Sequence, residues 1–447
     1  MEIQPENPYI ELSSVLAQEL LRCLAKKSSK VQDKYDYYNA DNDIRDFGIS
    51  TPARMRNSRP GVGWASRAVN TLSDRVAFDG FANDTFGIND YLDDINGYSV
   101  ISKATHDAFI AGCSFIMVSD DAVTNRKLLV PFTANEATGI IDDTSGLLRL
   151  GLAVTKWNEP KQKRRGVRFE PCDFMVFTPD FTAIFKSRTI SEIIPNPTGR
   201  CLLHPLTHRS SADRPLGKSR LTNTARRIIQ EVGRLKRREE IAEEFYALPQ
   251  RYISGLAEGA KKDPNLDSAI GKVWVINKDE DGEKPEIGQL TQMEIDQFET
   301  AKKDKARDFC AETALTLRNL GYETSNPTSA ESLTAMSDDL LLEATKSQDE
   351  LGKQIKEIVI TLRLALDRNN IIPDGLNKIV SAWKPIFQVD IGAAGDAMFK
   401  LFTVMPELAG TIAGYRMLGV GIREAEELQK RRLALTSSSF MNNGSTK

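Results

Sequence analysis

Gly321-Tyr322-Glu323-Thr324-Ser325-Asn326-Pro327-Thr328-Ser329-Ala330-Glu331-Ser332-Leu333 is a short polar stretch between two segments with helical periodicity. Thr328 and Glu331 have the S/T-x-x-E order of a capping box, in which each side chain accepts from the other residue's amide. Pro327 prevents the preceding helix from continuing. The pattern predicts a polar loop that is held at both ends by long helices and can be presented to a polymer.

Composition indicates a globular protein of several subdomains. The chain has 447 residues, 40% hydrophobic and 27% charged, with a net charge of −3, which favours two to four subdomains. It contains no apolar run of the roughly 18 to 20 residues that a membrane span needs. Residues 1–8 lack the pattern of a signal peptide. We expect a cytoplasmic origin, no membrane contact and no global electrostatic attraction to nucleic acid.

Long amphipathic helices dominate the expected structure. Helical spacing of apolar residues predicts helices over residues 9–26, 64–76 and 91–111, followed later by longer ones. These cover 219–246, 292–320 and 329–368, and 393–435 forms a last helical region broken at Pro406 and Gly419. The helices at 219–246 and 292–320 have about 30 residues each, or about 45 Å. We expect them to form an antiparallel pair.

Strands are expected in two places. The first group lies between the helix at 91–111 and the first long helix, at residues 114–118, 128–132, 138–141, 147–156, 167–169, 174–178 and 183–186. The second group is small, at 251–254 and 272–276, and lies between the two long helices. The Ser/Asn-rich tail from 436 to 447 is expected to be disordered. The fold class is therefore α+β, with a mixed α/β domain and a small β-rich module.

A relaxed phosphate-loop pattern occurs at Ala212-Asp213-Arg214-Pro215-Leu216-Gly217-Lys218-Ser219. The chemistry requires a flexible loop whose backbone amides surround a phosphate. Pro215 lacks an amide, and Ala212 replaces the first glycine. A nucleotide site at Gly217-Lys218-Ser219 remains an alternative, and the competing interpretation is a turn before a helix with Ser219 as its N-cap.

Catalytic, metal and cofactor sites are not indicated. His204 and His208 are separated by Pro205, which disfavours a helical metal pair, and the five cysteines form no C-x-x-C pair. Acidic pairs such as Asp120-Asp121 are typical of turns and helix faces. We expect no catalytic residue, no metal, no cofactor and reduced thiols.

Basic side chains form a stripe on the first long helix, at Arg220, Arg227, Arg234 and Arg238, and a basic group on the second, at Lys302, Lys303, Lys305 and Arg307. Such stripes can be solvated faces with acidic partners at helical spacing. They can also form a subunit interface or line a channel for DNA.

The order of these elements resembles the portal proteins of tailed bacteriophages over residues 35–432. Five segments carry the resemblance: Ala111-Gly112-Cys113-Ser114-Phe115-Ile116-Met117-Val118, Arg214-Pro215-Leu216-Gly217-Lys218-Ser219-Arg220, Phe245-Tyr246-Ala247-Leu248-Pro249-Gln250-Arg251-Tyr252, Asn326-Pro327-Thr328-Ser329-Ala330-Glu331-Ser332-Leu333 and Leu418-Gly419-Val420-Gly421-Ile422. In this family they look like the wing's helix-to-strand step, the entry to the first stem helix, the stem-to-clip passage, the exit of the tunnel loop and the crown.

The resemblance implies a division of the chain. It predicts a wing (1–217), a first stem helix (218–248), a clip (249–290), a second stem helix (291–320), a tunnel loop (321–329), a long wing helix with its return (330–392), a crown (393–435) and the tail (436–447). It also implies a non-enzymatic homo-oligomer, a closed ring of twelve subunits at one capsid vertex of the virion, assembled in the host cytoplasm. Double-stranded DNA would pass through the ring during packaging and ejection.

The resemblance also implies roles for particular residues. The residues that would face DNA from the tunnel loop are Tyr322, Thr324, Asn326, Thr328 and Ser329. The basic stem faces would comprise Arg227, Arg234, Arg238, Lys302, Lys303 and Lys305. The clip would contact the large terminase and later the head-tail adaptor through Arg251, Tyr252, Trp274, Asp279, Glu280 and Asp281. The major capsid and scaffold proteins are further expected partners.

Two other functions compete with this interpretation. One is a P-loop NTPase of the DNA-packaging machinery that uses Gly217-Lys218-Ser219. The other is a helical structural virion protein without a channel.

The mildly acidic composition suits a conduit for DNA. A strongly basic channel would neutralise the DNA phosphates and hold the DNA in place.

Overall fold

The computed structural model describes residues 9–45, 59–121, 126–142, 144–158, 170–246, 251–256, 274–277, 286–289, 296–322, 338–386 and 391–443. They form two compact units. The first unit comprises Met1–Tyr38, Ser66–Thr222 and Thr328–Lys447, and the second comprises Asn39–Ala65 and Asn223–Pro327. Helices and several antiparallel sheets are segregated along the chain, which confirms the α+β prediction.

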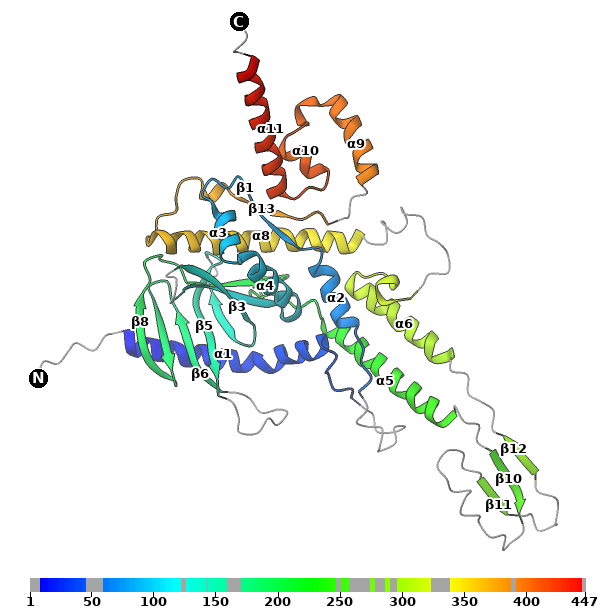
Figure 1. Ribbon diagram of the computed structural model, residues 1–447. Helices are drawn as coiled ribbons and strands as arrows, with labels where there is room; N and C mark the ends of the chain where they lie inside the picture. The colour runs from blue at the N-terminus through cyan, green and yellow to red at the C-terminus, as the bar shows by residue number, and fades with distance from the viewer. Residues whose placement is uncertain are drawn as a thin grey trace, which may run out of the picture. The chain divides into compact units, whose positions relative to one another are not determined.

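The largest sheet of the first unit is a five-stranded antiparallel meander (Figure 1). Its strands, in order, are β4 (Ala137–Ile141), β5 (Leu148–Trp157), β6 (Pro171–Phe177), β7 (Phe181–Lys186) and β8 (Thr189–Pro195). The predictions for β4 to β7 are confirmed within a few residues. β8 was missed because, as an edge strand exposed along most of its length, it lacks an alternating apolar pattern. The predicted strand at 167–169 lies outside the described residues.

A second sheet of the first unit has the order β3-β2-β9. β2 (Cys113–Asp120) is its buried central strand, between β3 (Lys127–Thr133) and β9 (Leu203–Thr207). β9 was not predicted, since Pro205 lies inside it. Proline is tolerated there because β9 is an edge strand, where Pro205 pairs with Phe115.

Helix α1 (Tyr9–Tyr38) covers the five-stranded sheet. Its buried residues Ala17, Leu20 and Leu24 pack against inward-facing residues of β5 to β7, among them Leu152 and Phe174. The prediction of a helix that ends at residue 26 was wrong. The lysines that follow do not end α1, because Lys27 Nζ and Lys34 Nζ donate to backbone oxygens of Ala137 and Ala111 while their stems lie along the protein.

The helix predicted at 91–111 is two helices, α3 (Ile88–Asp94) and α4 (Gly97–Ala111). Asn96 interrupts it with a φ of 54°, a left-handed conformation that asparagine tolerates better than most residues. By contrast, α2 (Trp64–Ser73) lies within the predicted range. α4 ends at Gly112, and the chain enters β2 directly, as the sequence predicted.

Helix α8 (Asp338–Asp367) has 30 residues, as many as α1, and belongs to the first unit. α8 contacts β2, β3 and β9 of the three-stranded sheet, whereas α1 contacts strands of the five-stranded sheet. On another side of α8, β1 (Phe78–Ala82) pairs with β13 (Val380–Trp383). Gly352 allows β13 to approach α8, since a Cβ there would lie 3.1 Å from that of Ser381. Residues 329–337 of the predicted helix lie outside the described residues.

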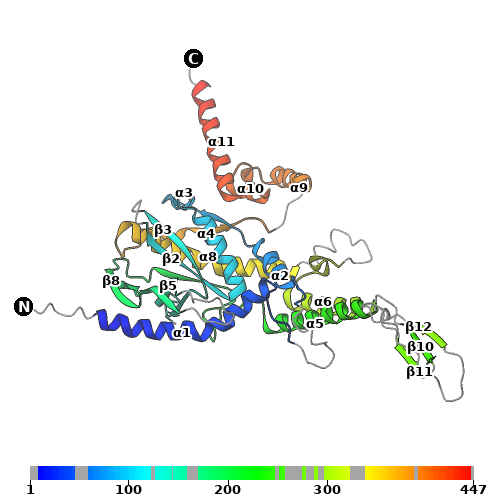
Figure 2. The same ribbon diagram turned by 60° about the horizontal axis from the view of Figure 1, so that its bottom comes forward.

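The second unit contains two helices that lie side by side, α5 (Asn223–Tyr246) and α6 (Asp296–Thr313) (Figures 1 and 2). α5 starts four residues later than predicted. α6 stops seven residues earlier, because Ala314 adopts a φ of 52° before the 3-10 helix η3 (Leu317–Leu320). A three-stranded sheet of β10 (Arg251–Leu256), β11 (Trp274–Asn277) and β12 (Glu286–Gln289) follows the order β11-β10-β12. β12 was not predicted.

The C-terminal part is helical as predicted. It contains α9 (Ile391–Val404), η5 (Pro406–Leu408), α10 (Ile412–Met417) and α11 (Ile422–Asn443), with breaks at Pro406 and Gly419. The carboxylate of Asp79 accepts the first amide of α11 at 2.5 Å, which anchors α11 beside β1. The prediction of a disordered tail from residue 436 was wrong for 436–443, which continue α11.

Candidate functional site

Two of the six basic residues predicted for the stem faces are used between α5 and α6. Lys302 is only 8% exposed, and its Nζ lies 2.9 Å from both carboxylate oxygens of Glu239 on α5 and 2.6 Å from Glu299. Lys305 Nζ lies 2.9 Å from Glu231 Oε2 on α5. These lysines therefore join the two helices.

The electrostatics of both lysines match this structural role. Burial acts to lower the pKa of Lys302, but hydrogen bonds and charge from Glu299 and Glu239 outweigh burial and raise it. The hydrogen bond and charge of Glu231 raise the pKa of Lys305. Both side chains therefore stay charged throughout the physiological pH range.

The arginines of α5 form a surface stripe. Arg227 and Arg238 are exposed and Arg234 is half-buried. Steps of seven and four residues keep all three within about 20° of one line on the helix, over about 16 Å of its length. Lys303 of α6 is also exposed. The structure also contains a buried arginine that the sequence did not single out, Arg237, at 3% exposure.

Few of the residues predicted for the tunnel loop and clip are described. Tyr322 is half-buried just after η3, and burial raises its pKa. Thr324, Asn326, Thr328 and Ser329 lie outside the described residues, as do the predicted capping box and Asp279, Glu280 and Asp281. Arg251 and Tyr252 lie on β10, and Tyr252 pairs in parallel register with Trp274 on β11.

The Gly217-Lys218-Ser219 segment does not have the form of a phosphate loop. The Gly217 amide donates to Arg214 O at 2.9 Å, and the Lys218 amide donates to His208 O at 2.7 Å. The Ser219 hydroxyl donates to Ile110 O and accepts from Leu221 N. The amides that would hold a phosphate are therefore used within the chain. No α-helix begins at Ser219 in the described segment 170–246, since α5 begins at Asn223.

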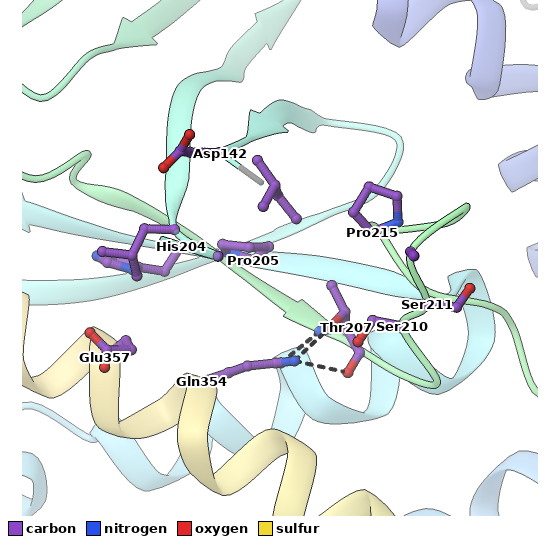
Figure 3. A pocket seen from close by; sticks show the side chains of 13 residues that line it. Asp142, His204, Pro205, Thr207, Ser210, Ser211, Pro215, Gln354 and Glu357 are labelled. Atoms are coloured by element: carbon purple, nitrogen blue, oxygen red, sulfur yellow. Dashed lines mark hydrogen bonds between the residues drawn. The ribbon is translucent and has the colours of Figure 1, made fainter. Parts of the chain in front are cut away.

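A pocket of about 320 Å³ lies in the first unit between β4–β5, β9, the segment after β9, and α8. Its labelled side chains include Asp142, His204, Ser210 and Gln354 (Figure 3). Burial, with a smaller contribution from the charge of Arg200, lowers the pKa of His204 to about 3, so the imidazole is neutral. The Ser210 hydroxyl donates to Glu350. The described lining residues thus contain no serine–histidine hydrogen bond that would activate a nucleophile.

In the described part of the chain, no group of three or more His, Cys, Asp or Glu side chains could hold a metal ion. All five cysteines are free thiols. None of the described helices combines the length and apolar character needed to cross a bilayer.

Comparison with known proteins gives relatives over nearly the whole chain. The portal protein of Mycobacterium phage D29 is 21% identical over 445 residues, which cover 95% of this chain and 90% of that protein. The portal protein of Mycobacterium phage L5 is 22% identical over 456 residues, with the same coverage. No protein-family model matches.

Similar solved structures include chains from gene transfer agent particles. One, from the neck of the native particle computed with C12 symmetry, has a TM-score of 0.44 and 11% identity and covers 87% of this chain and 99% of its own. Another, from the virion of the native particle, has a TM-score of 0.43 and 12% identity and covers 85% and 95%. Over 95% of its length, this chain is similar in sequence to the portal proteins of these two mycobacteriophages.

Proposed function

We propose that copies of this chain assemble into a closed ring at one vertex of a phage capsid, and that double-stranded DNA enters and leaves through the ring's central channel. The observation that carries the proposal is the similarity to two phage portal proteins over 95% of the chain. A ring forms from a head-to-tail interface whose rotation closes, and twelve subunits is the number that the family resemblance implies.

Exposed apolar side chains of the C-terminal helices support assembly. Phe399 and Val404 of α9 are 76% and 77% exposed, and Met405, Met417 and Leu433 are each more than half exposed. α9 has only Asp396 and Lys400 as charged residues among its 14. A helix that is apolar on all sides is normally buried, so we infer that a neighbouring copy covers this region, which corresponds to the predicted crown.

The helix pair of the second unit would form the stem. Ion pairs of Lys302 and Lys305 join its two helices, and the exposed Arg227 and Arg238 place positive charge on the surface of α5. We propose that this stripe contacts DNA phosphates weakly and reversibly. Residues 321–329 would form the tunnel loop, in which Tyr322, Thr324, Asn326, Thr328 and Ser329 face the DNA.

The remaining partners follow the same proposal. The small sheet and its connections, residues 249–290, would form the clip that docks the large terminase and then the head-tail adaptor. Capsid and scaffold proteins would surround the wing during assembly in the host cytoplasm. The terminase would supply ATP hydrolysis, because the amides of Gly217 and Lys218 are engaged by protein oxygens and are not available to a nucleotide.

Native mass measurement of the purified full-length protein tests this proposal, together with electron-microscope images along the particle axis. We expect a multiple of the 49.8 kDa subunit mass and a central hole. A monomer that hydrolyses ATP, with activity lost in Lys218→Ala, would establish the NTPase alternative instead. A solid assembly without a hole would indicate a structural virion protein without a channel.

A further inference from the structure

A buried cluster of charges in the first unit joins α8 to the segment that precedes α5. Glu343, in the second turn of α8, has a side chain that is 7% exposed. One of its carboxylate oxygens bonds to the guanidinium of Arg220, which is 1% exposed, and the other lies 3.1 Å from Arg209 NH2. One buried carboxylate therefore serves two arginines.

The neighbouring histidine, His208, is not a charged partner of Glu343. His208 Nε2 lies 3.9 Å from Glu343 Oε1, and its ring packs edge-on against Phe109 with the centroids 4.9 Å apart. Burial, followed by the charges of Arg209 and Arg220, holds the pKa of His208 well below its usual value. His208 is therefore neutral, and the two arginines are the positive groups in ion-pair contact with Glu343.

The segment from His208 to Thr222 is also fixed on its other side, by the end of α4. The Arg220 amide donates to Phe109 O at 3.0 Å, and the Ser219 hydroxyl donates to Ile110 O at 2.5 Å. The His208 amide donates to Gly112 O at 3.0 Å. α5 begins at Asn223, three residues after Arg220. The cluster thus holds the chain at the point where it enters the first helix of the second unit.

Later turns of α8 hold the start of the same segment by weaker polar contacts. The Glu350 carboxylate accepts the amides of Arg209 and Ser210, each at 2.9 Å. Gln354 donates to the Thr207 hydroxyl at 2.7 Å and accepts its amide at 2.7 Å (Figure 3). The contacts with Glu350 reach exposed residues, whereas Glu343 and Arg220 are almost fully desolvated.

Stability alone does not explain a buried ion pair at this position. Desolvation of two charges costs about as much as their attraction returns, and apolar replacement of such pairs is often neutral or stabilising. The buried positions of α8 next to Glu343 include the apolar Leu340 and Ala344 as well as the polar Ser347 and Gln348. A leucine at 343 facing a methionine at 220 would continue the apolar part of that surface.

We propose that Glu343 is a positioning residue for DNA translocation, which fixes the placement of residues 208–222 by binding Arg220 and Arg209 at the same time. This inference rests on the proposed function as a portal. Arg209 and Arg220 both belong to this segment, so the one carboxylate holds the segment at two points, one half-exposed and one buried. An apolar contact would hold α8 to the segment but could not fix the two guanidinium groups in set positions.

The test compares two double variants of the full-length protein. Arg220→Met/Glu343→Leu removes the buried pair. Arg200→Met/Glu357→Leu is the matched control, because Glu357 also lies on α8 and its pair with Arg200, 36% and 20% exposed respectively, lies outside the cluster. Thermal unfolding and native mass report folding and assembly, and packaging by capsids with the variant portal and terminase is counted per assembled ring.

We expect both double variants to unfold within about 3 °C of the unsubstituted protein and to assemble normally. Packaging per ring should fall about tenfold for Arg220→Met/Glu343→Leu, a usual size for coupling between sites, and should stay unchanged for the control. Unchanged packaging by Arg220→Met/Glu343→Leu overturns the inference. If the unsubstituted protein itself forms no ring and packages no DNA, the proposed function fails with it.

Arg220→Lys covers the case in which the double variant does not fold. Lysine keeps the charge but lacks the planar fork of the guanidinium. Normal rings with reduced packaging would support the inference, and normal packaging would overturn it. Loss of folding in both variants would also count against it, because the charges would then serve stability.

Discussion

Lys302 on α6 and Glu239 on α5 form an ion pair in which the lysine Nζ lies 2.9 Å from each carboxylate oxygen. Both side chains are largely buried, at 10% and 14% exposure. Because a desolvated charge that loses its partner is costly, the pair makes the contact between the two helices specific.

Glu239→Gln should lower the free energy of unfolding by about 2 kcal/mol, since Lys302 keeps only the exposed Glu299 as an acidic partner. Urea denaturation of the full-length protein measures the change. Asp304→Asn is the control, because its pair with Arg307 on α6 is exposed on both sides and should change stability by less than about 0.5 kcal/mol. Equal effects of the two substitutions would contradict a structural role for Lys302.

Asp107 should make stability fall as pH rises from about 4 to 6. Burial raises its pKa to about 6, partly opposed by the Tyr35 hydrogen bond and helped by the charge of Glu136. The folded state then binds a proton that the unfolded chain has lost, so folding weakens through this window. Asp107→Asn should raise stability at pH 7 by about 2 kcal/mol.

The gain from Asp107→Asn should shrink toward zero near pH 4, where the carboxyl group is protonated in the folded protein. Denaturation at pH 7 and pH 4.5 gives the comparison. Tyr35→Phe is the opposite control, because it removes the 3.3 Å hydrogen bond to the carboxylate and should lower stability at pH 7. A gain from Asp107→Asn that is equal at both pH values would refute the assignment.

Gly217→Ala should prevent normal folding, whereas Gly146→Ala should be tolerated. Both glycines have positive φ, 75° and 71°. A Cβ at Gly217 would lie 2.4 Å from Gly112 O and 2.7 Å from His208 O, while one at Gly146 meets nothing within 4 Å. We expect a loss of about 1 kcal/mol at Gly146 from the left-handed backbone alone, and soluble yield and thermal unfolding should separate the two variants.

Phe399→Ser should weaken assembly without unfolding the subunit. Phe399 is 76% exposed in the single chain, so its loss removes little from the core. Met398, its neighbour, is 6% exposed, and Met398→Ser should instead lower the thermal midpoint. Native mass across a dilution series measures ring stability. Rings of Phe399→Ser that dissociate at the same concentration as unsubstituted rings would place the subunit interface elsewhere.

Arg227→Gln/Arg238→Gln should make DNA binding by assembled rings less dependent on salt, because each lost phosphate contact removes counterion release. Arg307→Gln is the control, since it removes an arginine of the same helix pair that already has an acidic partner. Binding across a salt series gives the slopes. If the double variant and the control have equal slopes, the α5 stripe does not face DNA.

The sequence by itself determined the secondary structure of those elements whose apolar residues recur at helical or strand spacing. Apolar residues at helical steps located α5 and α8. Alternation of apolar and polar residues, with turn residues between the segments, located β4 to β7. The same patterns, in their order along the chain, were enough for the resemblance to portal proteins, which the two phage relatives support.

Only the tertiary structure decided where polar residues act. Nothing near Lys302 in the sequence distinguishes it from Lys303, yet one is paired with Glu239 and the other is exposed. Glu343 looks like an ordinary helix residue until Arg209 and Arg220, more than a hundred residues earlier in the chain, come to lie on either side of its carboxylate. The reason is physical: periodicity records which face of an element is apolar, whereas the partner of a charge depends on contacts between segments far apart in the chain.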